Sequence, residues 1–173
     1  LAPGKHSPVP DKVRTPGYPL LLLVLGDPEP NEDWAWRFGM MQAAMSVAVV
    51  LFSYLLARRM SGWQAGIVCG ALVATNPFIS NMAVYLLSET SFTFLMLAAG
   101  VLSLRASDEG APLPWAIAAG LCWGLCSLVR PTTEFFLPML LAGTLLLPSW
   151  HRWRRPAAVA TLAFALAMAP WMV

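Results

Sequence analysis

The stretch FGMMQAAMSVAVVLFSYLLA, residues 38–57, is apolar throughout, with Gln42, Ser46 and Ser53 as mild polar interruptions. An α-helix rises about 1.5 Å per residue, so about 20 mostly apolar residues cross a bilayer core that is about 30 Å thick. This stretch therefore predicts a transmembrane helix without any help from its flanks.

The composition of the whole chain also favours a membrane protein. Of its 173 residues, 58% are apolar and 12% are charged, and the mean hydropathy is +0.63. Soluble domains average about 45–50% apolar and about 25% charged residues, so a water-soluble globule of this composition would expose large apolar patches. The formal net charge of +2, without a long basic run, excludes nucleic acid as a partner. Membrane lipids are the expected surroundings.

Five more apolar runs follow the first, and together they predict an all-α fold, a polytopic transmembrane helix bundle of about six spans. The predicted spans cover residues 38–57, 61–79, 85–104, 112–129, 135–147 and 157–173. Residues 20–25 are apolar but too few to cross a bilayer, and Pro19 before them suits the start of a short interfacial helix. We therefore expect residues 1–33 to form the end of an external loop with this helix, and residues 34–173 to form the bundle.

Arginines follow every second predicted span. Because short cytoplasmic loops accumulate Lys and Arg, these loops are predicted to be cytoplasmic in a plasma (inner) membrane, with residues 1–33 external. They carry Arg58/Arg59, Arg105 and Arg152/Arg155.

Two predicted spans carry small residues at four-residue spacing. These are Gly66, Gly70 and Ala74 in the second span and Ala116, Gly120 and Gly124 in the fourth. Such stripes let helix backbones approach closely in lipid, so we expect them to pack helices together; a groove for lipid is the alternative. The three cysteines, Cys69, Cys122 and Cys126, lie inside apolar runs and predict neither a disulfide framework nor a metal site.

Two ionisable residues at the predicted external ends of spans are candidates for function, since a charge in or near the membrane is costly. Glu89 lies one turn into the third span beside Ser88 and Ser91, and a carboxyl that reaches up to water is the plain alternative. Arg130 ends the fourth span, and a local ion pair with Glu134 at i+4 is the corresponding alternative. Both candidates are predicted to face the same compartment, where they could share one site.

The N-terminal segment offers two further candidates. Arg14 and Tyr18 precede the predicted interfacial helix, which would hold them at the depth of lipid phosphates. Binding of ordinary phospholipid by Arg14 is the alternative to a specific site.

Four short motifs occur in order along the chain: RTPGYPLL at residues 14–21, LLSE at 86–89, LVRP at 128–131 and APW at 169–171. In this order and topology they resemble the polytopic GT-C glycosyltransferases, closest to the protein O-mannosyltransferase-like family (family 39), which includes bacterial enzymes that modify lipid A with aminoarabinose. The resemblance extends from about residue 13 to the end of the chain.

The resemblance implies an enzyme that transfers a sugar, with inversion, from a polyprenyl-phosphate carrier to an external or luminal protein, lipid or glycan. On this basis Arg14, Tyr18 and Arg130 are expected near the donor phosphate, and Glu89 corresponds to the carboxylate of the family's Leu-Ser-Glu pattern. The resemblance implies no cofactor; a divalent metal is possible in the family.

One departure concerns the catalytic aspartate, which the family carries in its first external loop, upstream of the Arg-Thr-Pro-Gly-Tyr-Pro pattern. Asp11 is the one acidic residue before Arg14 and does not match that position. We therefore assign no catalytic base, expect it upstream of Leu1, and expect the chain in isolation to be inactive. The competing hypothesis is a non-enzymatic polytopic membrane protein, such as a transporter or half of a scaffold.

Overall fold

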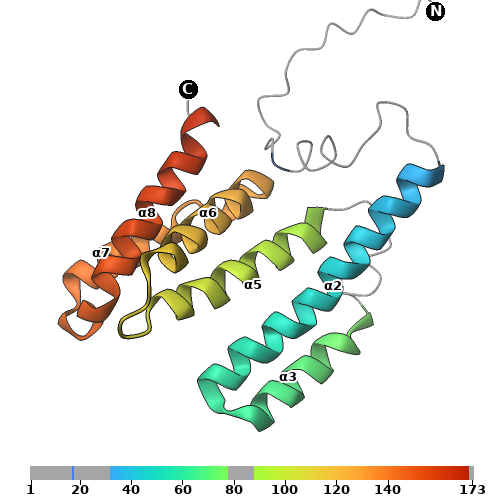
Figure 1. The fold of residues 1–173 in the computed structure, drawn as a ribbon, viewed down its shortest axis with the longest axis horizontal. Helices are drawn as coiled ribbons and strands as arrows, with labels where there is room; N and C mark the ends of the chain where they lie inside the picture. Colours follow the sequence, from blue (N-terminus) through green and yellow to red (C-terminus); the bar gives the residue numbers. More distant parts are fainter. Residues whose placement is uncertain (1–16, 18–31, 78–87, 172–173) are drawn as a thin grey trace, which may run out of the picture.

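A computed structural model of the chain describes residue 17 and residues 32–77 and 88–171 (Figure 1). Within these ranges the chain forms six α-helices and three short 3-10 helices, and no strand. The α-helices are α2 (Glu32–Ser61), α3 (Trp63–Ala74), α5 (Ser88–Ala106), α6 (Leu113–Val129), α7 (Phe136–Leu146) and α8 (Arg154–Met168). The 3-10 helices are η1 (Pro131–Thr133), η2 (Pro148–Trp153) and η3 (Ala169–Trp171). The all-α class is confirmed in the described ranges, and each predicted span overlaps an α-helix there.

The helices pack as a series of neighbours that run in alternating directions (Figure 1). α3 packs on α2, α2 on α5, α5 on α6, α6 on α8, and α8 on α7. The tight turn between α2 and α3 passes through Gly62, whose φ of 90° favours glycine because a side chain is strained there. As a result the C-terminal ends of α2, α5 and α7 lie at one end of the bundle, and the C-terminal ends of α3, α6 and α8 lie at the other.

Helix length tests the number of spans. In the part of the chain that the structure describes, one helix is long and apolar enough to cross a membrane: residues 36–61, 26 residues within α2. α3 and α6 are apolar but have 12 and 17 residues, which makes them about 18 and 26 Å long. α5 has 19 residues with Glu89 in its first turn and Arg105 in its last. Beyond α2, the six-span arrangement stays a prediction.

Close approach of helices explains the small-residue stripes. A Cβ atom at Gly66 would lie 2.9 Å from Arg58 Cβ of α2, and one at Gly124 would lie 2.7 Å from Ala167 Cβ of α8. Gly120 is tighter still, because its Cβ would overlap the backbone of α8 at Ala160. The prediction that these glycines pack helices together is confirmed, whereas Ala74 at the end of the first stripe is exposed.

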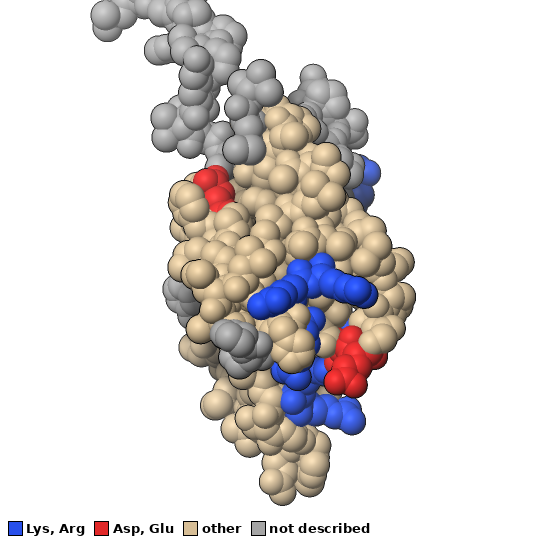
Figure 2. Space-filling model, turned by 90° about the vertical axis from the view of Figure 1, so that its left-hand side faces the viewer, with Lys and Arg blue, Asp and Glu red and all other residues tan. Residues whose placement is uncertain are grey.

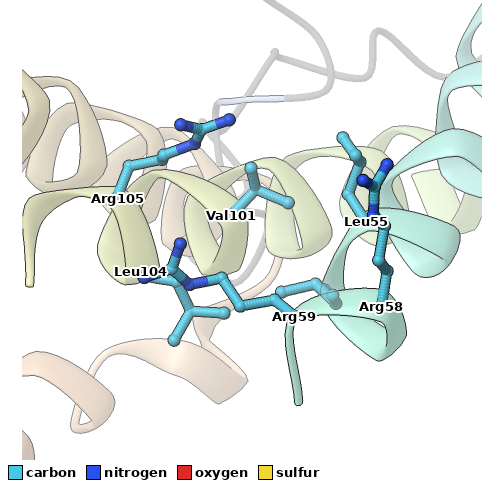
Figure 3. Close-up of a pocket in the computed structure, with 7 residues that line it drawn as sticks. Leu55, Arg58, Arg59, Val101, Leu104 and Arg105 are labelled. Carbon is cyan, nitrogen blue, oxygen red and sulfur yellow. The ribbon is translucent and has the colours of Figure 1, made fainter. Parts of the chain in front are cut away.

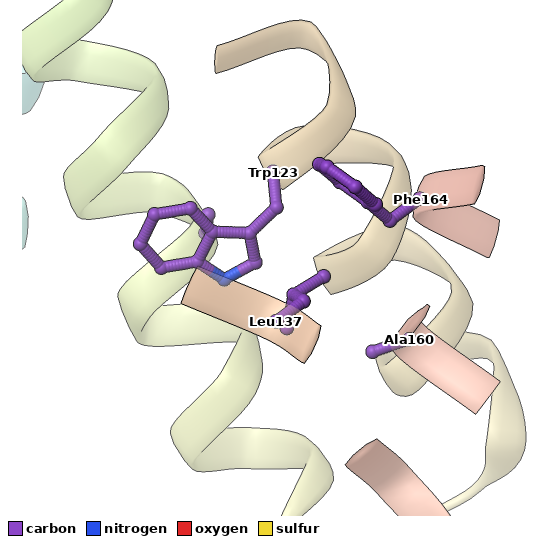
Figure 4. Packing of buried hydrophobic residues seen from close by; sticks show 5 residues of the cluster. Trp123, Leu137, Ala160 and Phe164 are labelled. Carbon is purple, nitrogen blue, oxygen red and sulfur yellow. The ribbon is translucent and has the colours of Figure 1, made fainter. Parts of the chain in front are cut away.

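The buried core lies where α5, α6, α7 and α8 meet (Figure 4). It consists of Ala99, Trp123, Leu137, Ala160 and Phe164. The indole N–H of Trp123 donates a hydrogen bond of 3.2 Å to Ser103 Oγ, so the large ring is buried without an unsatisfied donor. Phe136 stacks on the same ring with 4.3 Å between centroids. This core fixes α5 against α6 and thereby places the residues at their ends.

The predicted interfacial helix at residues 20–25 lies outside the described residues. The predicted boundary between residues 33 and 34 falls at the start of α2, and of residues 1–31 the structure describes Gly17 alone.

Candidate functional site

Arg130 is positioned by the way α6 ends. The residue before a proline is driven out of the helical region, and Arg130, which precedes Pro131, is extended with φ −144° and ψ 126°. Its backbone N–H still donates to Cys126 O at 2.9 Å, so it closes the last turn of α6. The following turn is held by a hydrogen bond of 2.8 Å between the hydroxyls of Ser127 and Thr133. The guanidinium therefore projects from a well-braced helix end.

Glu89 is the acid that meets this guanidinium. It lies in the first turn of α5, where the positive end of the helix dipole favours a carboxylate. Arg130 Nη2 donates to Glu89 Oε1 at 2.5 Å, across 41 positions of sequence. Of the two possibilities left open by the sequence, the structure shows the long-range contact: among the described residues, no ion pair joins Arg130 to Glu134.

The pair is partly accessible. The Arg130 side chain is 43% exposed and that of Glu89 is 32% exposed. One turn along α5, the ring of Phe92 lies 5.7 Å from the guanidinium carbon, in range of a cation–π interaction. An arginine has five N–H donors, and the contacts among described residues engage one of them. The remaining donors can bind a further anion such as a phosphate.

The carboxylate of Glu89 has only one of its two oxygens in a hydrogen bond among the described residues. Glu89 Oε2 is buried and has no hydrogen-bond partner in the part of the chain that the structure describes. A buried carboxylate oxygen without a partner is costly, and such an atom in a native site calls for an explanation.

Gly17, the one described residue of the N-terminal motif, lies against the same helix end. A Cβ atom at Gly17 would lie 2.5 Å from the carbonyl carbon of Leu128 and 2.7 Å from the backbone nitrogen of Val129. The glycine is thus pressed against the last turn of α6, immediately before Arg130. Arg14 and Tyr18 themselves lie outside the described residues, and their roles stay predictions.

Gly17 and Phe92 were not singled out from the sequence as parts of the site. The signal for Gly17 was its place inside the motif at residues 14–21, but a glycine in a Pro-Gly pair also suits an ordinary turn. Phe92 had no distinguishing signal among eight phenylalanines. In the described ranges, no group of three or more His, Cys, Asp or Glu side chains is placed to hold a metal ion.

Comparison with known proteins adds one match. The model of the dolichyl-phosphate-mannose-protein mannosyltransferase family matches residues 29–173, which includes Glu89 and Arg130 and begins after the motif at residues 14–21. No curated protein matches the chain. No solved structure matches it either. Members of the matched family are membrane proteins with glycosyltransferase activity. The chain belongs to the dolichyl-phosphate-mannose-protein mannosyltransferase family.

Proposed function

We propose that this protein is a membrane glycosyltransferase that moves a sugar, with inversion, from a polyprenyl-phosphate carrier to an acceptor hydroxyl on the external face. The observation that carries the proposal is the Arg130 guanidinium, braced by Glu89 at a partly exposed helix end beside Gly17 of the N-terminal motif. Family membership favours this transferase over a transporter or scaffold.

Sugar transfer from a carrier phosphate requires fixed positive charge at the leaving phosphate. When the bond from the anomeric carbon to the carrier phosphate breaks, the phosphate takes the electron pair and gains negative charge. Donors that are already oriented toward such a charge often provide the largest part of catalysis, because no reorganisation is needed during the reaction. Arg130 has its backbone fixed by Pro131 and its guanidinium fixed by Glu89, so it meets this requirement.

Glu89 is proposed as a positioning residue. Its Oε1 atom holds one edge of the guanidinium, which leaves the other N–H groups for the donor phosphate. Its Oε2 atom, buried without a partner among the described residues, would accept a hydrogen bond from the segment or substrate that completes the site.

Arg14 and Tyr18 are proposed to complete the phosphate site. They are three residues and one residue from Gly17, so chain connectivity limits the Cα atom of Arg14 to about 11 Å from that of Gly17. An arginine side chain within that distance can reach the same phosphate as Arg130. The acceptor hydroxyl must lose its proton to a general base, and we assign that base to no residue of the described ranges.

The surface of the bundle supports insertion in a bilayer. Large apolar side chains are exposed along the helices, with Val47 of α2 71% exposed and Leu166 of α8 66% exposed. Water would penalise this surface and lipid would not. We propose that the end with Arg130 faces outward and that the opposite, arginine-rich end faces the cytoplasm.

The test compares substitutions at the two ends of the bundle in the complete gene product. Arg130→Gln should lower turnover of a polyprenyl-phosphate sugar roughly 100-fold or more, the size of effect seen when one preorganised donor is removed. Arg152→Gln is the matched control, because it makes the same change at an exposed arginine on η2. Equal turnover by the two variants would remove Arg130 from the donor site.

A further inference from the structure

A second feature lies at the opposite end of the bundle from Arg130. Between the C-terminal parts of α2 and α5 is an open hollow of about 520 Å³. Its lining consists of Leu55, Leu56, Arg58 and Arg59 from α2 and Val101, Leu104 and Arg105 from α5 (Figure 3). The volume is within the range of about 300–1,000 Å³ that is typical of small-molecule sites.

The three arginines line the hollow from two helices, and Val101 lies between Arg105 and Arg58 in the view of Figure 3. Arg59 forms an ion pair with Asp108 in the turn after α5. Arg58 is oriented by Tyr54, whose hydroxyl accepts a hydrogen bond of 3.2 Å and whose ring lies 5.9 Å from the guanidinium carbon. Because Tyr54 is uncharged, neither of these two contacts neutralises the charge of Arg58.

The Arg105 guanidinium has no hydrogen bond or ion pair to any residue in the described ranges. Together with Arg58 it leaves two positive charges at the hollow that no described acid offsets. Figure 2 shows the wider setting: arginine side chains gather on this end of the molecule, where α2, α5 and η2 carry arginines in their last turns. An anion is therefore attracted to this end by the field of several arginines as well as by the two in the hollow.

The remaining walls are aliphatic. Val101, Leu104 and Arg105 are three and four positions apart, so they share the face of α5 that is turned toward α2. Leu55 and Leu56 form the facing wall on α2. A small inorganic anion would use the arginines and leave these side chains uncovered, whereas an amphiphile with an anionic head uses both.

We propose that this hollow binds an anionic phospholipid, with its phosphate between Arg58 and Arg105 and the first part of an acyl chain against the leucine and valine walls. The proposal rests on the proposed membrane insertion, but it concerns the other end of the bundle from the donor site. Loss of this lipid site leaves sugar transfer at Arg130 intact, so the two proposals can fail separately.

The experiment is a titration of the purified complete protein in detergent with phosphatidylglycerol, followed by native mass spectrometry. Phosphatidylcholine with the same acyl chains is the uncharged comparison, and inorganic phosphate is the soluble competitor. The protein should retain one phosphatidylglycerol more tightly than phosphatidylcholine, and millimolar phosphate should not displace it. The double variant Arg58→Gln, Arg105→Gln should bind phosphatidylglycerol roughly 30-fold more weakly.

Two further variants separate a built site from a general charge effect. Arg152→Gln, Arg155→Gln removes the same charge from the same end but outside the hollow, and should weaken binding far less than the Arg58→Gln, Arg105→Gln pair does. Val101→Trp keeps both arginines and fills the hollow, and should weaken retention. The proposal is overturned if both double variants lose binding equally, if Val101→Trp binds normally, or if phosphate displaces the lipid. Turnover of the lipid-linked sugar should be unchanged in all three variants.

Discussion

Replacement of Gly17 by alanine tests whether the N-terminal motif must sit against the end of α6. The added Cβ atom would lie 2.5 Å from the carbonyl carbon of Leu128, whereas ordinary contacts begin at 3.4 Å. The atoms that oppose it belong to the backbone of a packed helix and cannot rotate away. The motif segment must therefore move outward by about 0.9 Å, and a displacement of about 1 Å at a catalytic site can cost roughly 100-fold in rate.

The assay is turnover of a polyprenyl-phosphate sugar by the complete gene product, together with helix content from circular dichroism. Gly39→Ala is the matched control, because it makes the same change in α2, where a Cβ would meet nothing within 4 Å. We expect the Gly17 variant to keep its helix content and lose most of its turnover, and the Gly39 variant to keep both. Normal turnover with Gly17→Ala would refute the placement of the motif at this site.

Three other predictions concern the bundle and its ion pairs. Gly120→Ala forces a Cβ into the backbone of α8 and should destabilise the protein by about 1–3 kcal/mol, seen as a lower thermal midpoint in detergent, while Gly39→Ala should not lower it. Glu89→Gln keeps an acceptor for the guanidinium and should reduce turnover less than Glu89→Ala; if both variants match the unmodified protein, Glu89 is only an interfacial carboxyl. Arg59→Gln breaks the pair with Asp108, which is solvent-exposed, so the thermal midpoint should fall by the equivalent of less than about 1 kcal/mol; a larger loss would mean that this pair holds α2 to α5.

The helices were largely predictable because their signals are local. The apolar run at residues 38–57 lies inside α2. Pro131 predicts the end of α6, which stops at Val129, two residues before the proline. The glycine stripes indicated which faces pack, since four-residue spacing places Gly120 and Gly124 on one side of α6. The number of spans was less predictable. An apolar run sets an upper limit on the length of a helix. The predicted span at residues 61–79 included the Asn76-Pro77 turn, whereas α3 ends before it, at Ala74.

Glu89 and Arg130 could be proposed as candidates from the sequence, but the contact between them could not. Glu89 and Arg130 are conspicuous in the sequence because charges are rare in this chain, yet local spacing favours Glu134 as the nearer partner of Arg130. The contact with Glu89 depends on how α5 packs on α6, which is decided by buried residues such as Ala99 and Trp123 and not by any spacing near the pair. The contact of Gly17 with Leu128 is equally invisible in sequence, because 111 positions separate the two residues.

The proposed reaction is tested most directly by measuring release of the polyprenyl-phosphate carrier together with sugar transfer. The complete gene product, reconstituted in vesicles, is given radiolabelled polyprenyl-phosphate mannose and a mixture of external acceptors, and free polyprenyl phosphate and glycosylated product are measured together. We expect one carrier phosphate released for each sugar transferred, with the anomeric configuration inverted, and about 100-fold less of both with Arg130→Gln. Sugar transfer without release of carrier phosphate, or transfer directly from a nucleotide sugar, would contradict the account.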